Sequence, residues 1–531
     1  MTDTVATEQN VGESQTEIDT PVIKSDAGDN RPHFNGRTVI YADYEQIDET
    51  NVVDALNFTL PAAKLNFAQI DYLWNYYKGV QPILGRTKDV RPEICNKIVE
   101  NHAQEIVMFK IGYQLAEPLQ YTCRTYEGEE QKEGGENPRL NDVNELNTLM
   151  FAEDKDSCDR DLFEWMCAGG LGYRMAEADE AEDIEDGGAP FEIYTLDPRI
   201  TYVVYSSAHH HKPIMAVWIG KDVHSDKTTY SCFTKDKFFR IVDNNISNGE
   251  GAGEAHTYNA IPIVEYRLNN ARMGVFEPVL PLLDAINAVE SNRLDGIEQT
   301  IQALMKFVNC AVTEEEFVAM LQLGAVQVTS TDDAQGKAEV DVIKNDLDQT
   351  STQVTKEDLY QAIVNICGMP NRNGQGGSTS DTGAAVLLRD GWTLAESHAK
   401  SYELQFKRAE RNFLRVILNI CKQAKEIDLS LRIRDIELTF NRRNYENILV
   451  KSQVLTTMLT CDKIHPQLAF QACGLFTDPE AAYLQSKQYM DEQRSNAPVL
   501  PEPAPIEPKS IGSQAGVPEP QGDNAANAAI A

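Results

Sequence analysis

The sequence predicts an α+β protein that is mainly helical. Apolar residues recur at three- and four-residue steps from Phe276 to Asn309 and again from Thr382 to about Glu426, which is the spacing of one helix face. Between residues 191 and 242, short segments alternate apolar with polar residues and are separated by turn residues, which indicates an antiparallel sheet. The length of 531 residues suggests more than one domain and allows a large core.

The composition is acidic. The chain has 48 Lys and Arg residues against 82 Asp and Glu residues, a formal net charge of -34. Such a surface is soluble and disfavours general adsorption to nucleic acid. No apolar run approaches the roughly 20 residues of a membrane helix, and the first residues lack the basic and apolar regions of a secretory signal. The ten cysteines are scattered without a CxxC pair, which is typical of reduced, buried residues.

The first half is expected to combine helices with the sheet. Residues 1–35 are polar and acidic, which predicts a disordered arm. Helices are expected at Asp71–Gly79, at Arg91–Tyr113 and, as one continuous helix, over residues 141–170. An acidic run with seven carboxylates follows at Glu177–Asp186. The expected strands are FEIYTL, ITYVVYS, IMAVWIG, TTYSCFT and KFFRIV.

The middle of the chain predicts a long helix followed by a small module. Pro278 and Pro281 fit the first turn of the helix over residues 276–309, which would be about 50 Å long. The module, residues 312–343, contains strand-like AVQVTS and AEVDVI and a short helix around Glu314–Leu323.

Two further helices are expected on either side of a glycine-rich loop. The first is TKEDLYQAIVNICGM, with Thr355 as its N-cap. The second starts at Thr382, with Gly391 as a candidate kink position. Helices of this length usually need a partner along them, and self-assembly is the economical source of one. The last thirty or so residues are rich in Pro, Ala and Gly, which predicts a tail with polyproline character.

No catalytic, cofactor or metal site is expected. GGLGYR at Gly169–Arg174 and GQGGST in the later loop contain glycines but lack the lysine of a P-loop. His209, His210 and His211 could bind a metal, but adjacent strand residues point to opposite faces, so a solvated surface turn is favoured. Carboxylate runs such as Glu177–Asp186 are typical of solvated faces. No Ser/His/Asp or Cys/His signature is found.

The stretch CGMPNRNGQGGSTSDTG, Cys367–Gly383, breaks the helical pattern with five glycines. One interpretation is a phosphate cradle, for which GQGGST is weak support. The other is a loop that contacts a moving or irregular partner, because glycine lets one loop adopt several conformations at low steric cost.

The order of these elements resembles that of the portal proteins of tailed bacteriophages, in the type associated with siphophage heads. NKIVENHAQEIVMFKIGYQLAEPLQY resembles the helix near the start of that family. LPLLDAINAVESNRLDGIEQT, with Asp284, Asn287 and Ser291, resembles its stem helix. GSTSDTGAAVLLRDGWTLAESHAKSYELQFKRAERNFLRVIL resembles the entry to its crossing helix, and IELTFNRRNYEN with DPEAAYLQS resembles its C-terminal end.

The resemblance covers about Asn35 to about Ser495, and its specificity comes from the order of diffuse helical patterns. The acidic insert at Glu177–Asp186 and the basic NRRN at Asn441–Asn444 depart from it. The resemblance implies a portal-type subunit with these regions: a disordered arm (1–35), wing (36–275), stem helix (276–311), clip (312–345), second stem helix (346–370), tunnel loop (371–383), long wing or crossing helix (384–440), crown (441–495) and a disordered Pro/Ala-rich tail (496–531).

The resemblance also implies where DNA would pass. The loop would face the duplex and make weak phosphate contacts without reading bases, through Asn371, Arg372, Asn373, Gln375 and Ser378. An acidic clip and channel wall would repel DNA and let it slide, through Glu314, Glu315, Glu316, Asp346 and Asp348. Solubility alone explains the same acidic composition equally well.

The implied function is a ring, usually of twelve copies, at one capsid vertex, acting as the channel for packaging and ejection of double-stranded DNA. The implied partners are the terminase large subunit, the major capsid protein and scaffold, head-completion and neck proteins, and double-stranded DNA bound non-specifically. The location would be the virion, and the host cytoplasm during assembly, with no membrane. Two alternatives remain open: an acidic capsid-assembly or scaffold protein without a channel, and a nuclease or phosphotransferase.

Overall fold

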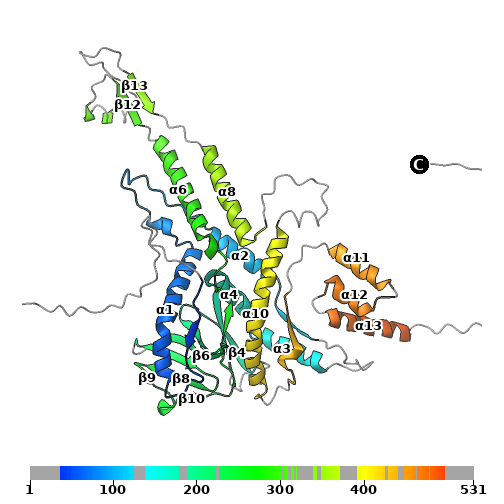
Figure 1. The fold of residues 1–531 in the computed structure, drawn as a ribbon. Coiled ribbons are helices and arrows are strands. Elements are labelled where there is room, and N and C mark those ends of the chain that lie inside the picture. The colour runs from blue at the N-terminus through cyan, green and yellow to red at the C-terminus, as the bar shows by residue number, and fades with distance from the viewer. Residues whose placement is uncertain are drawn as a thin grey trace, which may run out of the picture. The chain divides into compact units, whose positions relative to one another are not determined.

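The computed structural model divides into two compact units, residues 1–450 and 451–531, each described here by itself (Figure 1). The described residues are 36–124, 138–178, 188–222, 226–301, 304–308, 313–315, 318–319, 339–343, 349–370, 391–424, 429–440, 448–461, 463–476 and 479–496.

In the described part of the first unit, helices alternate with strands that form four sheets. Its elements up to the last strand of the wing-like part are β1 (Ile40–Ala42), α1 (Val52–Tyr77), α2 (His102–Gln114), β2 (Gln120–Cys123), α3 (Pro138–Ala152), α4 (Lys155–Gly169), β3 (Leu171–Ala178), β4 (Phe191–Leu196), β5 (Thr201–Ser206), β6 (Pro213–Lys221), β7 (Thr228–Phe233), β8 (Lys237–Val242), β9 (Asn245–Ile246), β10 (Glu254–Ala255) and β11 (Ile263–Arg267). The rest are α6 (Leu280–Ile301), β12 (Leu304–Val308), β13 (Glu339–Ile343), α8 (Gln349–Cys367), α10 (Trp392–Cys421) and β14 (Ile436–Thr439).

Three further helices lie at the end of the described chain: α11 (Ile448–Leu459), α12 (Pro466–Cys473) and α13 (Pro479–Asn496). Short 3₁₀ turns occur at Pro82–Gly85, Gly249–Gly251, Glu277–Val279 and Ile433–Asp435. Within the second unit, α12 packs on α13, and the rings of Phe470 and Tyr483 meet with centroids 5.9 Å apart.

The largest sheet has the order β1-β5-β6-β7-β8-β10, with β9 also paired to β8. β1 runs parallel to β5, whereas the other pairs are antiparallel. α1 covers one face of this sheet, because its buried residues Val52, Leu56 and Ala63 share an apolar cluster with Tyr202 and Phe239 of the strands. The amphipathic spacing of α1 therefore fixes where the sheet is covered.

All five strand-like pieces of the sequence are confirmed as β4 to β8. One detail of the prediction was wrong: FEIYTL, which is β4, does not join the other four. It pairs with β3 in a separate three-stranded sheet of order β11-β3-β4. Its partner strand could not be read from local alternation, because that pattern shows which face is buried and not which strand lies beside it.

Three helix predictions had wrong boundaries. The helix expected from Arg91 starts only at His102, and the helix expected at Asp71 starts already at Val52. The continuous helix over 141–170 is two helices, α3 and α4, separated at Asp154, which has a φ of 46°. A left-handed residue cannot continue a right-handed helix, so the chain turns there.

Three predictions about the long helices were also wrong. The helix expected to reach Asn309 ends at Ile301, and residues 304–308 form β12, which pairs with β13 from Leu304↔Ile343 to Val308↔Glu339. Thr355 is not an N-cap, because α8 already starts at Gln349 and the Thr355 hydroxyl donates to the Ser351 carbonyl at 2.9 Å. Gly391 does not kink a helix; it is the N-cap of α10, with a φ of 82°.

A buried cluster of charges joins α10 to α4 and β3 in the first unit. Lys155 and Asp159 of α4 lie 2.6 Å apart, and Arg174 of β3 also bonds Asp159. Glu410 of α10 lies 3.3 Å from Lys155 and 3.4 Å from Arg174. All four side chains are at most 3% exposed, so two cations and two carboxylates neutralise one another away from water.

Two tyrosines complete this charge cluster, which consists of Lys155, Asp159, Arg174, Glu410, Tyr121 and Tyr266. Tyr121 of β2 donates to Glu410 at 2.5 Å, and Tyr266 of β11 donates to its other oxygen. Burial acts to raise the pKa of Glu410, but Lys155, Arg174 and the two hydroxyls together hold that pKa below its usual value. The carboxylate therefore stays ionised and fixes α10 against α4, β2, β3 and β11.

Replacing Glu410 with Ala should lower the free energy of unfolding by about 3–5 kcal/mol, because Arg174 and Lys155 would keep buried charges without their partner. Urea unfolding followed by circular dichroism measures the change. Glu437→Ala is the control, since Glu437 is an exposed carboxylate on β14 and its loss should cost about 0.5 kcal/mol or less. A loss below about 1 kcal/mol for Glu410→Ala would show that the cluster does not hold these elements.

Candidate assembly and channel site

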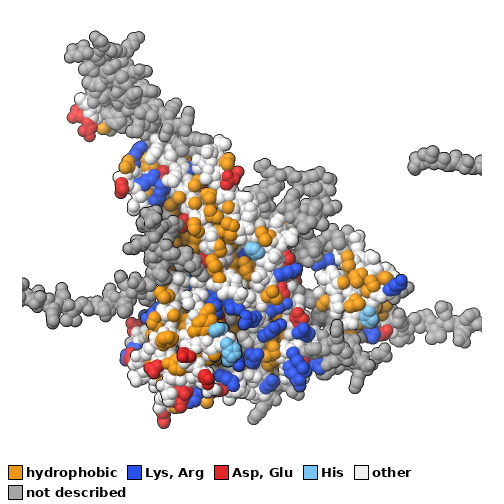
Figure 2. Space-filling model, viewed as in Figure 1, with side chains coloured by type: hydrophobic (Ala, Val, Ile, Leu, Met, Phe, Trp, Pro, Cys, Tyr) orange, Lys and Arg blue, Asp and Glu red, His pale blue; other side chains and the backbone are white. Residues whose placement is uncertain are grey.

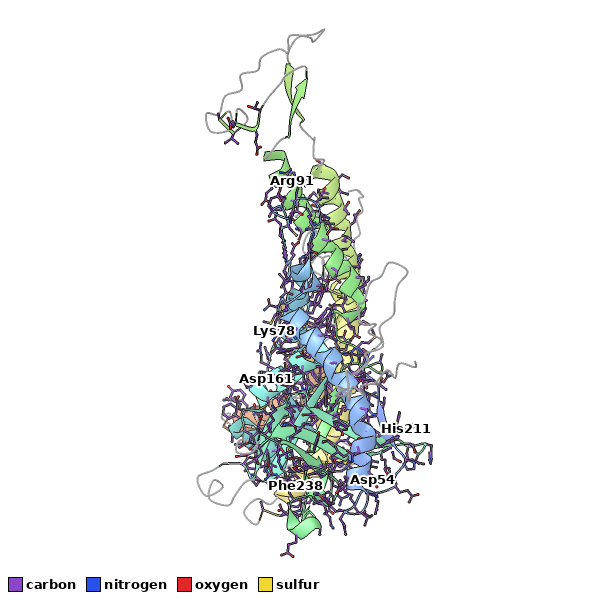
Figure 3. All side chains as sticks on the ribbon, turned by 90° about the vertical axis from the view of Figure 1, so that its left-hand side faces the viewer. Asp54, Lys78, Arg91, Asp161, His211 and Phe238 are labelled. Atoms are coloured by element: carbon purple, nitrogen blue, oxygen red, sulfur yellow. The ribbon has the colours of Figure 1, made fainter. Side chains whose placement is uncertain are left out.

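The helices α6 and α8 lie side by side in both views of the first unit and contact each other along their length (Figures 1 and 3). Arg293 of α6 donates to Gln353 of α8 at 3.0 Å. Lys356 of α8 lies 3.0 Å from Glu290 of α6 and 3.0 Å from Glu100 of the preceding segment. The pair is therefore held by polar contacts as well as by its apolar stripe.

One polar face of α6 binds the chain before α2. Asn287, Ser291 and Asp295 are spaced by four residues and are all buried, so they lie on one face of the helix. Their side-chain oxygens accept backbone N–H bonds from Glu100 at 2.8 Å, from Ile98 at 3.0 Å and from Asn96 at 2.7 Å, respectively. We call residues 287, 291, 295, 96, 98 and 100 the α6 ladder.

The α6 ladder works because two repeats match. Four residues of an α-helix advance about 6 Å, and two residues of an extended chain advance about 6.6 Å. Every second amide of residues 96–100 therefore meets every fourth side chain of α6. This pairing also explains why the helix expected from Arg91 starts only at His102: the amides of residues 96, 98 and 100 are already used by α6.

Asp295 carries the charged end of the α6 ladder. Its carboxylate also accepts from the Asn96 side chain at 2.9 Å, lies 3.0 Å from Arg86 and bonds Lys88. Burial acts to raise the pKa of Asp295, but the Lys88 bond, the two Asn96 donors and Arg86 hold that pKa below its usual value. Residues 86–100 are thus tied to α6 by an ionised side chain, and Figure 3 shows Arg91 of this segment beside the upper part of α6.

Apolar side chains remain exposed around the α6–α8 pair. Ile297 of α6 and Val354 and Ile366 of α8 are 39%, 51% and 51% exposed. Val80 and Val90 of the neighbouring segment are more exposed still. Figure 2 shows apolar side chains gathered over the two helices. Exposed apolar area of this kind on a paired helix is typical of an interaction surface.

The C-terminal end of α8 is buried and leads into the predicted tunnel loop. Gly368 has a φ of 60°, and a Cβ there would lie 2.7 Å from Nδ1 of His398 on α10. Glycine is therefore required by both conformation and space. Lys110 of α2 donates to the Gly368 carbonyl at 3.1 Å, which satisfies a carbonyl at the helix end.

The Lys110 ammonium is buried between α2, α8 and α10. It lies over the rings of Phe109 and Tyr402, 5.7 Å and 6.0 Å from their centroids. Burial lowers the pKa of Lys110 to about 8, and burial raises the pKa of the nearby Cys367 thiol to about 12. Burial also lowers the pKa of His398. Lys110 forms no ion pair with a carboxylate of the described residues, so its charge is held by the Gly368 carbonyl and the two ring faces.

Most of the predicted DNA-facing residues lie outside the described part of the chain. This holds for Asn371, Arg372, Asn373, Gln375 and Ser378 of the loop, and for Glu316, Asp346 and Asp348 of the acidic set. Glu314 and Glu315 are described, and both side chains are exposed. The strand AVQVTS and NRRN at 441–444 also lie outside the described residues, whereas AEVDVI is confirmed as β13.

The other sequence candidates do not converge on one place. His209, His210 and His211 lie in the turn between β5 and β6, as the surface-turn interpretation predicted, and all three are exposed. Of the acidic run, Glu177 lies near the end of β3. Burial is the larger cause that raises the pKa of Glu177, and the negative charge of Glu192 is the smaller one. Among the described residues, no three His, Cys, Asp or Glu side chains are placed to hold one metal ion. The described helices include none long and apolar enough to cross a membrane.

A sequence model of the family described as "Phage portal protein, SPP1 Gp6-like" matches residues 57–498. The chain belongs to this family. The match spans most of the chain, including all strands of the large sheet except β1, the α6 ladder, the α6–α8 pair and α10. The portal resemblance of the sequence is therefore confirmed, and the protein is a phage portal protein.

Two solved structures are similar to this portal chain. One is the neck of a native gene transfer agent (GTA) particle computed with C12 symmetry; it is 12% identical over 70% of this chain and 89% of that chain, with a TM-score of 0.40. The other is the virion of a native GTA particle, 12% identical over 77% of this chain and 93% of that chain, with a TM-score of 0.43. No curated protein matches the sequence significantly.

Sequence reasoning missed two features of this portal subunit. Asn287, Ser291 and Asp295 lie off the apolar stripe of this helix, and the sequence gives no partner for them. Their four-residue spacing was a signal for a second buried face, but nothing local indicated residues 96–100 as the partner. Lys110 gave no signal, because a lysine in an amphipathic helix is ordinarily exposed.

Asp295→Ala should release residues 96–100 from α6. We expect the backbone amide of Asn96 to exchange with solvent about tenfold faster or more, because a buried donor loses a charged acceptor. Hydrogen exchange followed by mass spectrometry measures this. Glu298→Ala on the same helix is the control, since Glu298 takes no part in the ladder and should leave the exchange unchanged. Equal protection in both variants would contradict the ladder.

Lys110→Met should remove a pH dependence between about pH 8 and 10.5. The folded-state pKa is lowered to about 8, so the unfolded chain binds more protons in that window and wild-type stability rises with pH there, relative to the variant. The full gain is about 3 kcal/mol, because 1.36 kcal/mol corresponds to one pKa unit. Urea unfolding of both proteins at pH 7.5 and 10.5 measures it. A constant difference between them would mean that Lys110 titrates normally.

Proposed function

We propose that this portal protein forms a closed ring of twelve copies at one capsid vertex. The number is the one that the family resemblance implies. The support on this chain is the exposed apolar area on the α6–α8 pair and the length of α10, which has 30 residues. Exposed apolar area on paired helices is normally covered by a partner, and in a ring the neighbouring copies would cover it.

We propose that the ring is the channel through which double-stranded DNA is packaged and ejected. In the implied division, residues 36–275 and 384–440 form the wing, 276–311 and 346–370 the stem, 312–345 the clip and 441–495 the crown. The α6 ladder supports a rigid stem, because it ties α6 to residues 96–100 of the wing. A rigid stem would keep the channel open while DNA moves.

The acidic residues support a wall that DNA slides past. From Thr313 to Thr355 the chain has nine carboxylates against Lys337 and Lys344. Glu314 and Glu315 are exposed and, with Glu316, Asp346 and Asp348, would repel phosphates and so prevent tight binding. The loop residues Asn371, Arg372, Asn373, Gln375 and Ser378 would supply weak contacts instead, without base readout.

The proposed partners follow from the same division. The clip would bind the terminase large subunit during packaging and head-completion or neck proteins afterwards, and the outer surface would meet the major capsid protein and scaffold. The protein would assemble in the host cytoplasm and remain in the virion. We propose no catalytic role, so hydrolysis of ATP would belong to the terminase.

Deleting residues 371–377 should separate assembly from packaging. The ring should still form with a mass about twelve times 59.3 kDa, because the flanking ends of α8 and α10 are held by Lys110 and Trp392 contacts. Packaged DNA per head should fall severalfold, because the loop is the proposed contact with the duplex. Arg372→Ala should have a milder effect, since one phosphate contact is a small part of a non-specific interaction.

Multi-angle light scattering gives the ring mass, and quantitative DNA measurement on purified heads gives packaging. Normal packaging by the shortened ring would remove the loop from the mechanism. A monomeric wild-type protein at micromolar concentration, across a range of salt, would overturn the ring itself.

A further inference from the structure

One side of α10 forms a basic surface on an otherwise acidic chain. Lys400, Leu404, Arg408, Arg411 and Arg415 are exposed, and their spacings of four, four, three and four residues place them on one side of the helix. We call these five residues the α10 face. Leu404, which lies between Lys400 and Arg408 on this face, is 69% exposed. Figure 2 shows Lys and Arg side chains gathered over this part of the unit.

The arginines of the α10 face are not neutralised within the described chain. Arg408 and Arg411 make no ion pair with any described residue, and Arg415 donates to Asn412 at 3.0 Å. Lys400 is only loosely paired, 3.6 Å from Glu396. In a protein of net charge -34, three such arginines within eight residues are available for an acidic partner.

The opposite side of the unit carries the complementary charge. Asp43, Glu45 and Asp48 precede α1, Asp54 lies in its first turn, and all four are exposed. Phe58, one turn further along α1, is 68% exposed. We call these five residues the α1 face; Figure 3, in which Asp54 is labelled, shows α1 toward the viewer.

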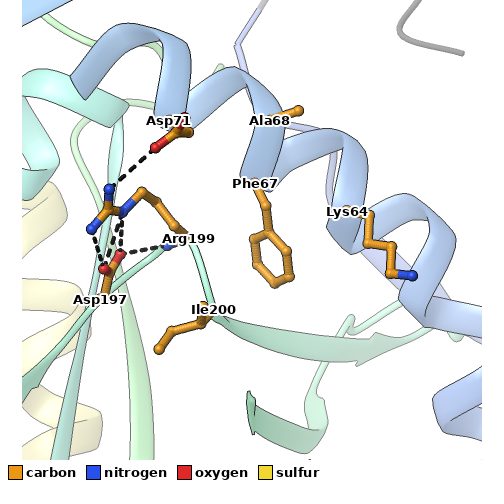
Figure 4. Close-up of a pocket in the computed structure, with 7 residues that line it drawn as sticks. All are labelled: Lys64, Phe67, Ala68, Asp71, Asp197, Arg199 and Ile200. Atoms are coloured by element: carbon orange, nitrogen blue, oxygen red, sulfur yellow. Dashed lines mark hydrogen bonds and ion pairs between the residues drawn. The ribbon is translucent and has the colours of Figure 1, made fainter. Parts of the chain in front are cut away.

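A pocket lies further along α1 than the α1 face (Figure 4). It has a volume of about 500 Å³ and lies between α1 and the start of β5, lined by Lys64, Phe67, Ala68, Asp71, Asp197, Arg199 and Ile200. Arg199 already pairs with Asp197 at 2.7 Å and with Asp71 at 3.1 Å. The Arg199 charge is therefore balanced, and the lining also offers Phe67, Ala68 and Ile200 to an apolar side chain.

The two faces are placed for a head-to-tail contact. α4 contacts α1, while α10 packs on β3 and β11 beyond it, so the α1 and α10 faces lie on different sides of the unit (Figures 1 and 3). A ring of identical copies requires two unlike surfaces that fit each other. An acidic face with a pocket and a basic face with a protruding leucine meet that requirement.

The order of features along the two helices also matches. α1 ends beside α2, where Tyr77 accepts from Asn101 at 2.8 Å, and α10 begins beside α2, where the rings of Trp392 and Tyr113 lie 5.8 Å apart. The helices therefore run in opposite directions. Asp54 precedes the pocket on α1, and Arg411 and Arg415 follow Leu404 on α10. When Leu404 lies at the pocket, the two arginines therefore extend along α1 toward its acidic end.

We propose that, in the ring of the proposed function on which this inference rests, the α10 face of one copy docks on the α1 face of the next. Leu404 enters the pocket lined by Phe67, Ala68 and Ile200, and Arg411 and Arg415 lie opposite Asp54 and the carboxylates of residues 43–48. DNA would also attract the arginines, but it would not use Leu404, and it would leave the pocket and the α1 face unused.

Charge reversal tests the electrostatic half of the contact. Arg411→Glu with Arg415→Glu should raise the concentration at half-assembly, measured by mass photometry, by about tenfold or more. Adding Asp54→Arg in the same chain should recover part of that loss. Lys235→Glu with Arg240→Glu is the matched control, because both residues are exposed, lie outside the two faces and give the same change of net charge. Circular dichroism checks that each variant folds.

The outcomes separate this inference from the proposed function. A wild-type protein that forms no ring overturns the proposed function. Normal assembly by the Arg411→Glu, Arg415→Glu protein overturns the docking of the two faces and leaves the ring intact. If that protein forms normal rings but retains less double-stranded DNA, the α10 face binds DNA, and the inference is wrong.

Disulfide cross-linking tests the apolar half without disturbing charge. Leu404→Cys combined with Ala68→Cys places thiols at exposed positions on the two helices. Oxidation of assembled rings should give a series of covalent dimers, trimers and larger oligomers on a non-reducing gel, because each copy links to the next. Wild-type protein gives the background from its own cysteines. A double-cysteine ring that yields no such series overturns the head-to-tail contact. Covalent dimers from Leu404→Cys alone also overturn it.

Discussion

The buried charge cluster around Glu410 is the interaction on which the rest of the first unit depends. Glu410 accepts from Tyr121 and Tyr266 and pairs with Lys155 and Arg174, so one carboxylate from α10 meets partners from four other elements. Burying four charges is costly, and removing any one leaves the others uncompensated. The cluster therefore stabilises one arrangement of α10, which in turn sets where the ends of α8 and α10 meet near Lys110.

A second constraint transmits this rigidity to α6. The α6 ladder uses side chains of a helix to satisfy the backbone of an extended segment nearly two hundred residues earlier. Buried backbone donors must find acceptors, and here they find them on α6, the helix proposed above as the stem. These bonds fix residues 96–100, which enter α2, against α6, as the proposed channel would require.

In the proposed ring, the charge distribution would serve assembly. The chain is strongly acidic overall, yet its described exposed arginines on α10 gather on one side, and exposed carboxylates gather at the start of α1. A uniform acidic surface would make copies repel one another. Under the proposed docking, the separation of the two signs onto different sides would let identical copies attract in one orientation, which is what a closed ring requires.

The sequence by itself determined the α+β class, the five strands β4 to β8 and the stripes of α6 and α10, because each shows a repeat of 2.0 or about 3.6 residues that exposes or buries one face. The portal order of these elements came from their resemblance to a known family. Only the tertiary structure decided that β4 joins β3 and that α6 stops at Ile301, where β12 follows and pairs with β13. It also decided that residues 96–100 lie along Asn287, Ser291 and Asp295. The burial of Lys110 and Glu410 is a third such outcome. These outcomes depend on partners distant in the sequence. Local periodicity shows that a face is covered but carries no information about which segment covers it.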